Sequence, residues 1–301
     1  MNVFATLLAT TLGLTGTPYQ QNNFHLSFRQ FASPLPQRDH SAPQGSQFVA
    51  KIAQLSEGQS EQEILNAVLA GNIPDFLRTL VPVTITNQKT RYGVASITFW
   101  VMPDYLAVGS DRDYVRLPLN LHSADRIADA FNLRLPTRKM VDAIYHQANV
   151  KLRPRPMRPG PQMTSAQYYQ RHHQMIEQDL SRLTPVAGQL IAGHKKDVVQ
   201  SRKLLRKPGS IAIYGWHQSN KKPIQPLSTV HHAAYADYSH GIRMVANHVE
   251  IRYENRPTQN YSLDEVLQDP KLCRLLSDEG QLDRKQLKLH AASQGKEKRN
   301  S

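Results

Sequence analysis

The stretch from Gln189 to Val245 reads QLIAGHKKDVVQSRKLLRKPGSIAIYGWHQSNKKPIQPLSTVHHAAYADYSHGIRMV. Apolar runs such as LIA, SIAIYGW and IRMV stand there between polar groups, glycines and prolines. Such short runs, rich in β-branched and aromatic residues, are typical of strands. Five of the thirteen histidines of the chain also lie in this stretch, namely His194, His217, His231, His232 and His240. We therefore expect a strand-rich region that carries a reactive site at the ends of its strands.

Helices are indicated on both sides of this stretch. Apolar residues at helical spacing follow two capping boxes, Ser60-x-x-Glu63 and Ser262-x-x-Glu265. In such a box each side chain bonds the backbone of the other residue, which marks the start of a helix. Thr137 is a third expected cap, for a helix over residues 138–148. Helices and strands in separate runs predict an α+β fold.

The order of these elements predicts two halves. Residues 81–86 and 92–102 are expected to form an antiparallel meander, with a turn at Asn87-Gln88. A connector rich in proline and arginine follows at 150–163. The predicted divisions are a leader (1–17), a flexible arm (18–59), a half of helices and meander (60–149), the connector (150–163), a strand-rich half that carries the site (164–290) and a charged tail (291–301).

The net charge of the chain indicates which classes of partner it would bind. It has 37 Lys and Arg against 24 Asp and Glu, a formal net charge of +13. A basic surface attracts anions, so nucleic acid and anionic or cell-wall polysaccharide are the expected partner classes. The single cysteine, Cys273, excludes an intrachain disulfide and a cysteine-rich zinc site.

The N-terminal run MNVFATLLATTLGLTGT resembles the hydrophobic part of a secretory signal peptide. It lacks a basic segment before it and a small-residue cleavage site after it, and it is short for a membrane span. We expect a secreted or periplasmic protein without a transmembrane span, with the cytoplasm as the alternative.

One chemistry open to the histidine-rich stretch is metal-assisted hydrolysis. Imidazole and carboxylate ligands that converge with one open position would let a zinc ion activate water. His194, Asp197 and His240 are the candidate ligands. Their spacing matches no established zinc signature, so zinc is the candidate cofactor without being required.

A second chemistry needs no metal. Uronate polymers are cleaved by β-elimination, which needs a base, an acid and cations to neutralise the carboxylate. Tyr238 and His240 fit the proton transfers, while Lys195, Lys196 and Arg243 fit the binding of the anion.

A third chemistry uses a nucleophile. Ser239 lies in Y-S-H-G rather than in G-x-S-x-G, and another histidine such as His217 would serve as its base, oriented by Asp197 or Asp237.

Weighing these chemistries, we predict an exported hydrolase that acts on an anionic or cell-wall polymer, with a polysaccharide lyase as the first alternative. A non-catalytic nucleic-acid- or carbohydrate-binding protein is the second, although no recognised nucleic-acid motif is present. The predicted catalytic residues are His194, Asp197, His217, Tyr238, Ser239 and His240. The predicted substrate-binding residues are Lys195, Lys196, Tyr214 and Arg243.

Overall fold

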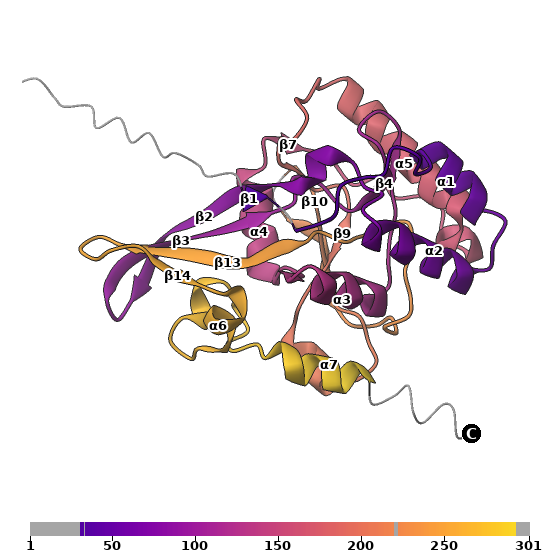
Figure 1. Cartoon of the computed structure of the whole chain (residues 1–301). Helices are drawn as coiled ribbons and strands as arrows, with labels where there is room; N and C mark the ends of the chain where they lie inside the picture. The colour runs from indigo at the N-terminus through magenta and orange to yellow at the C-terminus, as the bar shows by residue number, and fades with distance from the viewer. Residues whose placement is uncertain (1–30, 33, 220–221, 293–301) are drawn as a thin grey trace, which may run out of the picture.

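The computed structural model describes residues 31–32, 34–219 and 222–292. It confirms the α+β class, with mostly antiparallel sheets. The expected leader (1–17) and charged tail (291–301) lie outside the described residues, apart from the last two residues of the final helix. Figure 1 shows long strands extending from one side of the body and helices α1, α2 and α5 gathered on the other.

The helices are α1 (Gly45–Ile52), α2 (Glu57–Leu69), α3 (Leu121–Ala130), α4 (Arg138–Gln147), α5 (Ala166–Ser181), α6 (Leu263–Gln268) and α7 (Arg284–Ala292). Short 3-10 turns are η1 (Asp75–Arg78), η2 (Pro161–Thr164), η3 (Arg202–Arg206) and η4 (Cys273–Leu275). The strands are β1 (Phe31–Ala32), β2 (Thr79–Thr90), β3 (Gly93–Val101), β4 (Ala107–Gly109), β5 (Tyr114–Arg116), β6 (Leu133–Arg134), β7 (Val150–Lys151), β8 (Ile191–Ala192), β9 (Lys196–Val198), β10 (Ile213–His217), β11 (Pro223–Ser228), β12 (His240–Gly241), β13 (Val245–Tyr253) and β14 (Gln259–Tyr261).

The largest sheet joins the two predicted halves. Its order is β1-β2-β3-β13-β14, and β6 also pairs with β13. Strands β2 and β3 precede the proline-rich connector, whereas β13 follows it and pairs with β3 along most of its length. Both main hydrophobic clusters likewise contain residues from before and after the connector, such as Phe99 with Val249.

A smaller sheet is built entirely from strands of the histidine-rich stretch. Its order is β11-β10-β9-β12, with β9 antiparallel to β10 and parallel to β12. Figure 1 places β9 and β10 in the middle of the molecule. Helix α4 contacts β2 of the large sheet and β10 of the small one. Its buried residues Met140, Val141, Ile144 and Tyr145 follow the helical spacing that its sequence predicts.

Of the three helix N-caps expected from the sequence, two are confirmed and one is wrong. Thr137 caps α4, and Ser262 with Glu265 forms the expected box at α6. The box at Ser60 is wrong, because α2 begins earlier: Ser56 is its cap and Gln59 completes the box. The Ser60 hydroxyl instead donates to the Ile52 carbonyl from within the helix.

Two other expectations need correction. The expected turn at Asn87-Gln88 is a bulge inside β2, where Asn87 has φ 55° and the register shifts between Ile85 and Gln88. The segment expected as a flexible arm, 18–59, lies outside the described residues at 18–30 and 33, and its described part contains α1, whose Phe48, Val49 and Ile52 are buried in the core.

Candidate functional site

The short strand β9 separates two groups of polar side chains. Lys196 lies opposite both Gly215 of β10 and His240 of β12. Successive side chains of a strand point to opposite faces. Lys195 and Asp197 therefore face Tyr105, while Lys196 faces Trp216, with its Nζ 4.9 Å from the indole.

The first group is a buried ion network around Asp104. Arg116 donates from Nε (2.9 Å) and Nη2 (2.6 Å) to Asp104 Oδ2, and His194 Nε2 lies 3.1 Å from Asp104 Oδ1. Burial alone would raise the pKa of Asp104, but Arg116 and His194 hold it below its usual range. Burial lowers the pKa of His194 to about 4, against the opposing effect of Asp104. Asp104 and Arg116 therefore form a charged pair that orients a neutral His194.

Asp197 belongs to the same buried region. Tyr105 donates its hydroxyl to Asp197 Oδ2 at 2.8 Å, and Arg243 Nε lies 3.8 Å from Oδ1. Burial raises the pKa of Asp197 to about 6, while Arg243 acts to lower it. Arg243 itself donates to the carbonyls of Met102 and Ile191.

These contacts change the roles expected for two cations. Arg243 and Lys195 are 0 % and 1 % exposed, and the Lys195 ammonium donates to the Tyr238 carbonyl. Both side chains join backbone segments in the interior, so the expectation that they bind substrate is not supported by their position. Lys196, which is half-buried, is the lysine of the pair that remains near the surface.

The three side chains expected to bind zinc do not converge in the described structure. No group of three or more His, Cys, Asp or Glu side chains is placed to hold a metal ion within the described ranges. His194 is bound to Asp104 and Asp197 to Tyr105, whereas His240 faces Asp237. The three proposed ligands thus have separate partners and do not form one coordination sphere.

His217 lies in a third group, on α4 and β10. Its Nε2 is 3.0 Å from Asp142 Oδ1, which also accepts the Tyr214 hydroxyl at 2.8 Å. The Tyr145 ring stacks on the imidazole at 4.4 Å. Asp142 has a side chain that is 38 % exposed, so this group reaches the surface. His146, one turn after Asp142 on α4, lies 2.6 Å from the Asp142 carbonyl through Nδ1 and edge-on to Tyr145, outside this group.

The second group on β9 is centred on His240. Asp237 Oδ2 is 4.0 Å from His240 Nε2 and accepts the Tyr235 hydroxyl at 3.1 Å. The Tyr235 ring lies edge-on to His240, with 5.7 Å between centroids, and stacks on His231 at 4.4 Å. With Lys196, these residues form what we call the His240 cluster: Lys196, His231, Tyr235, Asp237 and His240.

His240 is the least satisfied side chain of this cluster. It is fully buried, and neither ring nitrogen has a hydrogen-bond partner among the described residues. A buried polar group left without a partner costs about 1–3 kcal/mol. Burial lowers the pKa of His240 to about 4, although Asp237 opposes this. The imidazole is therefore neutral at neutral pH.

Ser239 and Tyr238 have structural partners. The Ser239 hydroxyl is fully buried and donates to Asp237 Oδ1 at 2.6 Å, and its backbone N–H donates to the same oxygen. The Tyr238 hydroxyl accepts the Met157 N–H at 2.8 Å. These contacts fix the loop before β12, and no histidine is bonded to the Ser239 hydroxyl in the described structure.

The backbone beside the His240 cluster is unusual. Gly215 and Trp216, consecutive residues of β10, have φ 111° and 57°. Positive φ is costly for a residue with a bulky side chain and is concentrated at functional sites. The conformation turns the Trp216 indole N–H toward the His194 carbonyl, at 3.2 Å, and sets the ring beneath Lys196.

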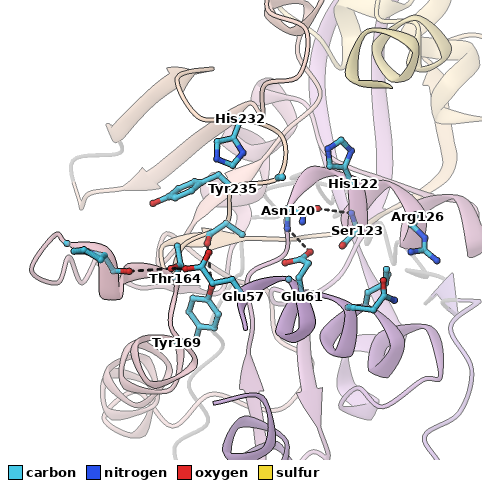
Figure 2. A pocket seen from close by; sticks show the side chains of 17 residues that line it. Glu57, Glu61, Asn120, His122, Ser123, Arg126, Thr164, Tyr169, His232 and Tyr235 are labelled. Carbon is cyan, nitrogen blue, oxygen red and sulfur yellow. Dashed lines mark hydrogen bonds between the residues drawn. The ribbon is translucent and has the colours of Figure 1, made fainter. Parts of the chain in front are cut away.

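A cavity of about 750 Å³ lies next to the cluster, and Tyr235 belongs to both. Figure 2 shows Glu57, Glu61 and Tyr169 on one side of it and His232 with Tyr235 on another. The volume is in the range of small-molecule sites. No local sequence pattern indicates this cavity, because α2 and the loop 231–236 meet only through the tertiary fold.

Comparisons identify no relative: the sequence matches no family model and shows no significant similarity to a curated protein or a solved structure. Within the described chain, no helix has the length and apolar character needed to cross a membrane.

Proposed function

We propose that the protein is an exported hydrolase of an anionic or cell-wall polymer, and that the His240 cluster supplies its acid–base chemistry without a metal. The observation that carries this proposal is a neutral, fully buried His240 whose ring nitrogens have no hydrogen-bond partner among the described residues. The apolar run at 1–17 supports export, and the net charge of +13 supports an anionic substrate.

In this mechanism His240 accepts a proton from water while the water oxygen attacks the electrophilic carbon of the substrate. The bond to the leaving group then breaks, and His240 returns the proton to that group. Asp237 stabilises the imidazolium that forms, because its carboxylate lies 4.0 Å away. Lys196 is placed to stabilise negative charge on the substrate. Tyr235 contacts His240 and also lines the cavity, so we propose the cavity as the route by which the substrate approaches His240.

One observation favours a lyase as the second candidate. A tyrosine, a histidine and a lysine meet in the His240 cluster, which provides the acid, base and cation of β-elimination. In that reaction His240 would remove the proton beside the carboxylate, and Tyr235 would protonate the leaving oxygen.

The test incubates the protein with polygalacturonate and with an insoluble cell-wall polymer. New reducing ends without near-ultraviolet absorption indicate hydrolysis, whereas an unsaturated product that absorbs there indicates a lyase. We expect His240→Gln to lower kcat roughly 10²–10⁴-fold, as for loss of a general base. We expect Lys196→Ala to lower it roughly 10²-fold or more.

Matched controls are His146→Gln and Lys207→Ala, because both side chains are exposed and lie outside the cluster. They should retain the parent rate. Full activity in His240→Gln, with an unchanged melting curve, would remove His240 from the mechanism. Absence of any product would leave the binding-protein alternative.

A further inference from the structure

The cavity beside the His240 cluster has a charge that contrasts with the rest of the protein. Glu57 and Glu61 stand four residues apart on α2, so they share a face of that helix. Both line the cavity, with Glu57 at its exposed margin and Glu61 half-buried. Arg126 is the single arginine or lysine among the described lining residues, and it is exposed.

The partners of the two carboxylates are neutral. Glu61 accepts the Asn120 N–H at 3.1 Å, and the Thr164 hydroxyl donates to Glu57. Neither glutamate has an ion-pair partner in the part of the chain that the structure describes. Burial raises the pKa of Glu61, and the described groups that oppose this rise are the hydrogen-bond donors Ser123 and Asn120, neither of which is charged. A half-buried carboxyl without a cation is costly and is stabilised when a positive charge approaches it.

Aromatic groups complete the cavity wall. Tyr169 and Tyr235 line it together with Glu61, and the Tyr169 hydroxyl is held by the Ala236 carbonyl at 3.4 Å. Figure 2 shows the Tyr169 ring close to Glu57. Aromatic faces next to carboxylates favour cations, through the ring quadrupole as well as through charge.

We propose that this cavity binds a protonated amine of the ligand, held by Glu61 and Glu57 between the rings of Tyr169 and Tyr235. The substrate class that follows is a polymer whose units bear free amino groups in addition to acidic groups. This extension to the substrate rests on the proposed function, because Tyr235 connects the cavity to the His240 cluster. The amine site itself rests on the cavity alone.

The experiment is calorimetric titration of the full chain, at low salt and pH 7, with three matched probes. The probes are a glucosamine trimer, its N-acetylated form and a glucose trimer of the same linkage. We expect the aminated probe to bind at least ten times more tightly than either neutral probe. Salt should weaken that difference, since charge–charge attraction is screened.

Variants locate the site. Glu61→Gln should weaken binding of the aminated probe about tenfold or more, and Glu57→Gln tests the second carboxylate at an exposed position. Glu63→Gln is the control, because Glu63 lies on the same helix, pairs with Lys51 and does not line the cavity.

Equal affinity for aminated and acetylated probes would overturn the proposal, as would binding that both Glu57→Gln and Glu61→Gln leave unchanged. Failure to bind any of the three probes would also overturn it. Since the titration needs no turnover, a negative result here is distinct from failure to detect hydrolysis, and a positive result stands even when no polymer is cleaved.

Discussion

The ion pair between Asp104 and Arg116 allows a sharp test of the interior. Their side chains are 2 % and 1 % exposed, so neither charge is solvated by water. Asp104→Ala would leave the Arg116 guanidinium with Glu177, whose side chain is 41 % exposed, and with the uncharged partners His173 and Tyr114. Removal of one member of a buried pair costs about 3–5 kcal/mol. We therefore expect Asp104→Ala to lower the free energy of unfolding by about 3–5 kcal/mol.

The double variant separates the charge effect from the loss of packing. Asp104→Ala combined with Arg116→Met removes both charges, and we expect it to recover a large part of the loss, because two apolar groups need no solvation. The measurement is urea denaturation at pH 7, followed by far-ultraviolet circular dichroism and tryptophan fluorescence. Asp278→Ala is the control: its pair with Arg138 is exposed and should contribute about 1 kcal/mol or less.

Two results would refute this reasoning. One is a loss below about 1 kcal/mol for Asp104→Ala, which would mean that the guanidinium finds water or another partner. The other is additivity of the two single variants, because a genuine pair must show an interaction energy between its members.

The remaining predictions concern pH and close packing. His194 and His240 have a pKa of about 4 in the folded chain and about 6.5 when unfolded. The unfolded chain therefore binds more protons between these values, and stability should fall from pH 6.5 to pH 4 by about 1 kcal/mol per pH unit for each histidine. Asp197, with its pKa raised to about 6, offsets part of this fall. Denaturation at pH 7 and pH 5 measures the difference. Gly241→Ala should cost about 1–3 kcal/mol, because its Cβ would lie 2.5 Å from the buried Tyr105 ring; a thermal melt measures this.

Controls for these predictions come from the same chain. Stability at pH 5 equal to that at pH 7 would contradict the account of the buried histidines. Gly58→Ala, on the exposed face of α2 with no atom within 4 Å of the added Cβ, should stabilise by up to about 1 kcal/mol. A similar gain for Gly241→Ala would contradict the packing argument.

Local signals predicted much of the fold. Thr137 and Ser262 mark true helix starts, because a cap depends only on residues within one turn. The Ser60 box failed because Ser56 with Gln59 offers the same chemistry four residues earlier. The bulge at Asn87 looked like a turn because both use a positive φ, and only the long pairing with β3 distinguishes them.

The sequence predicted which region of the chain holds the candidate site, but not which side chains contact one another there. The sequence indicated His240 and Lys196, which do meet, because they lie on adjacent strands β12 and β9. It could not indicate that His194 is held by Asp104, 90 residues away. Partners at such separations are chosen by the tertiary fold, and a single sequence carries no local pattern for them.

The alternation along β9 has a consequence for variation at two neighbouring positions. Lys195 is bound to a backbone carbonyl in the interior, and Lys196 lies over an indole near the surface. The two neighbouring lysines therefore differ in role: Lys195 stabilises the interior, whereas Lys196 is available near the surface. In a mutational scan, substitutions at position 195 should lower the yield of folded protein and its melting temperature. Substitutions at position 196 should instead change ligand binding or turnover. Exchange to arginine should be tolerated better at 196, which is half-buried, than at 195, which is 1 % exposed.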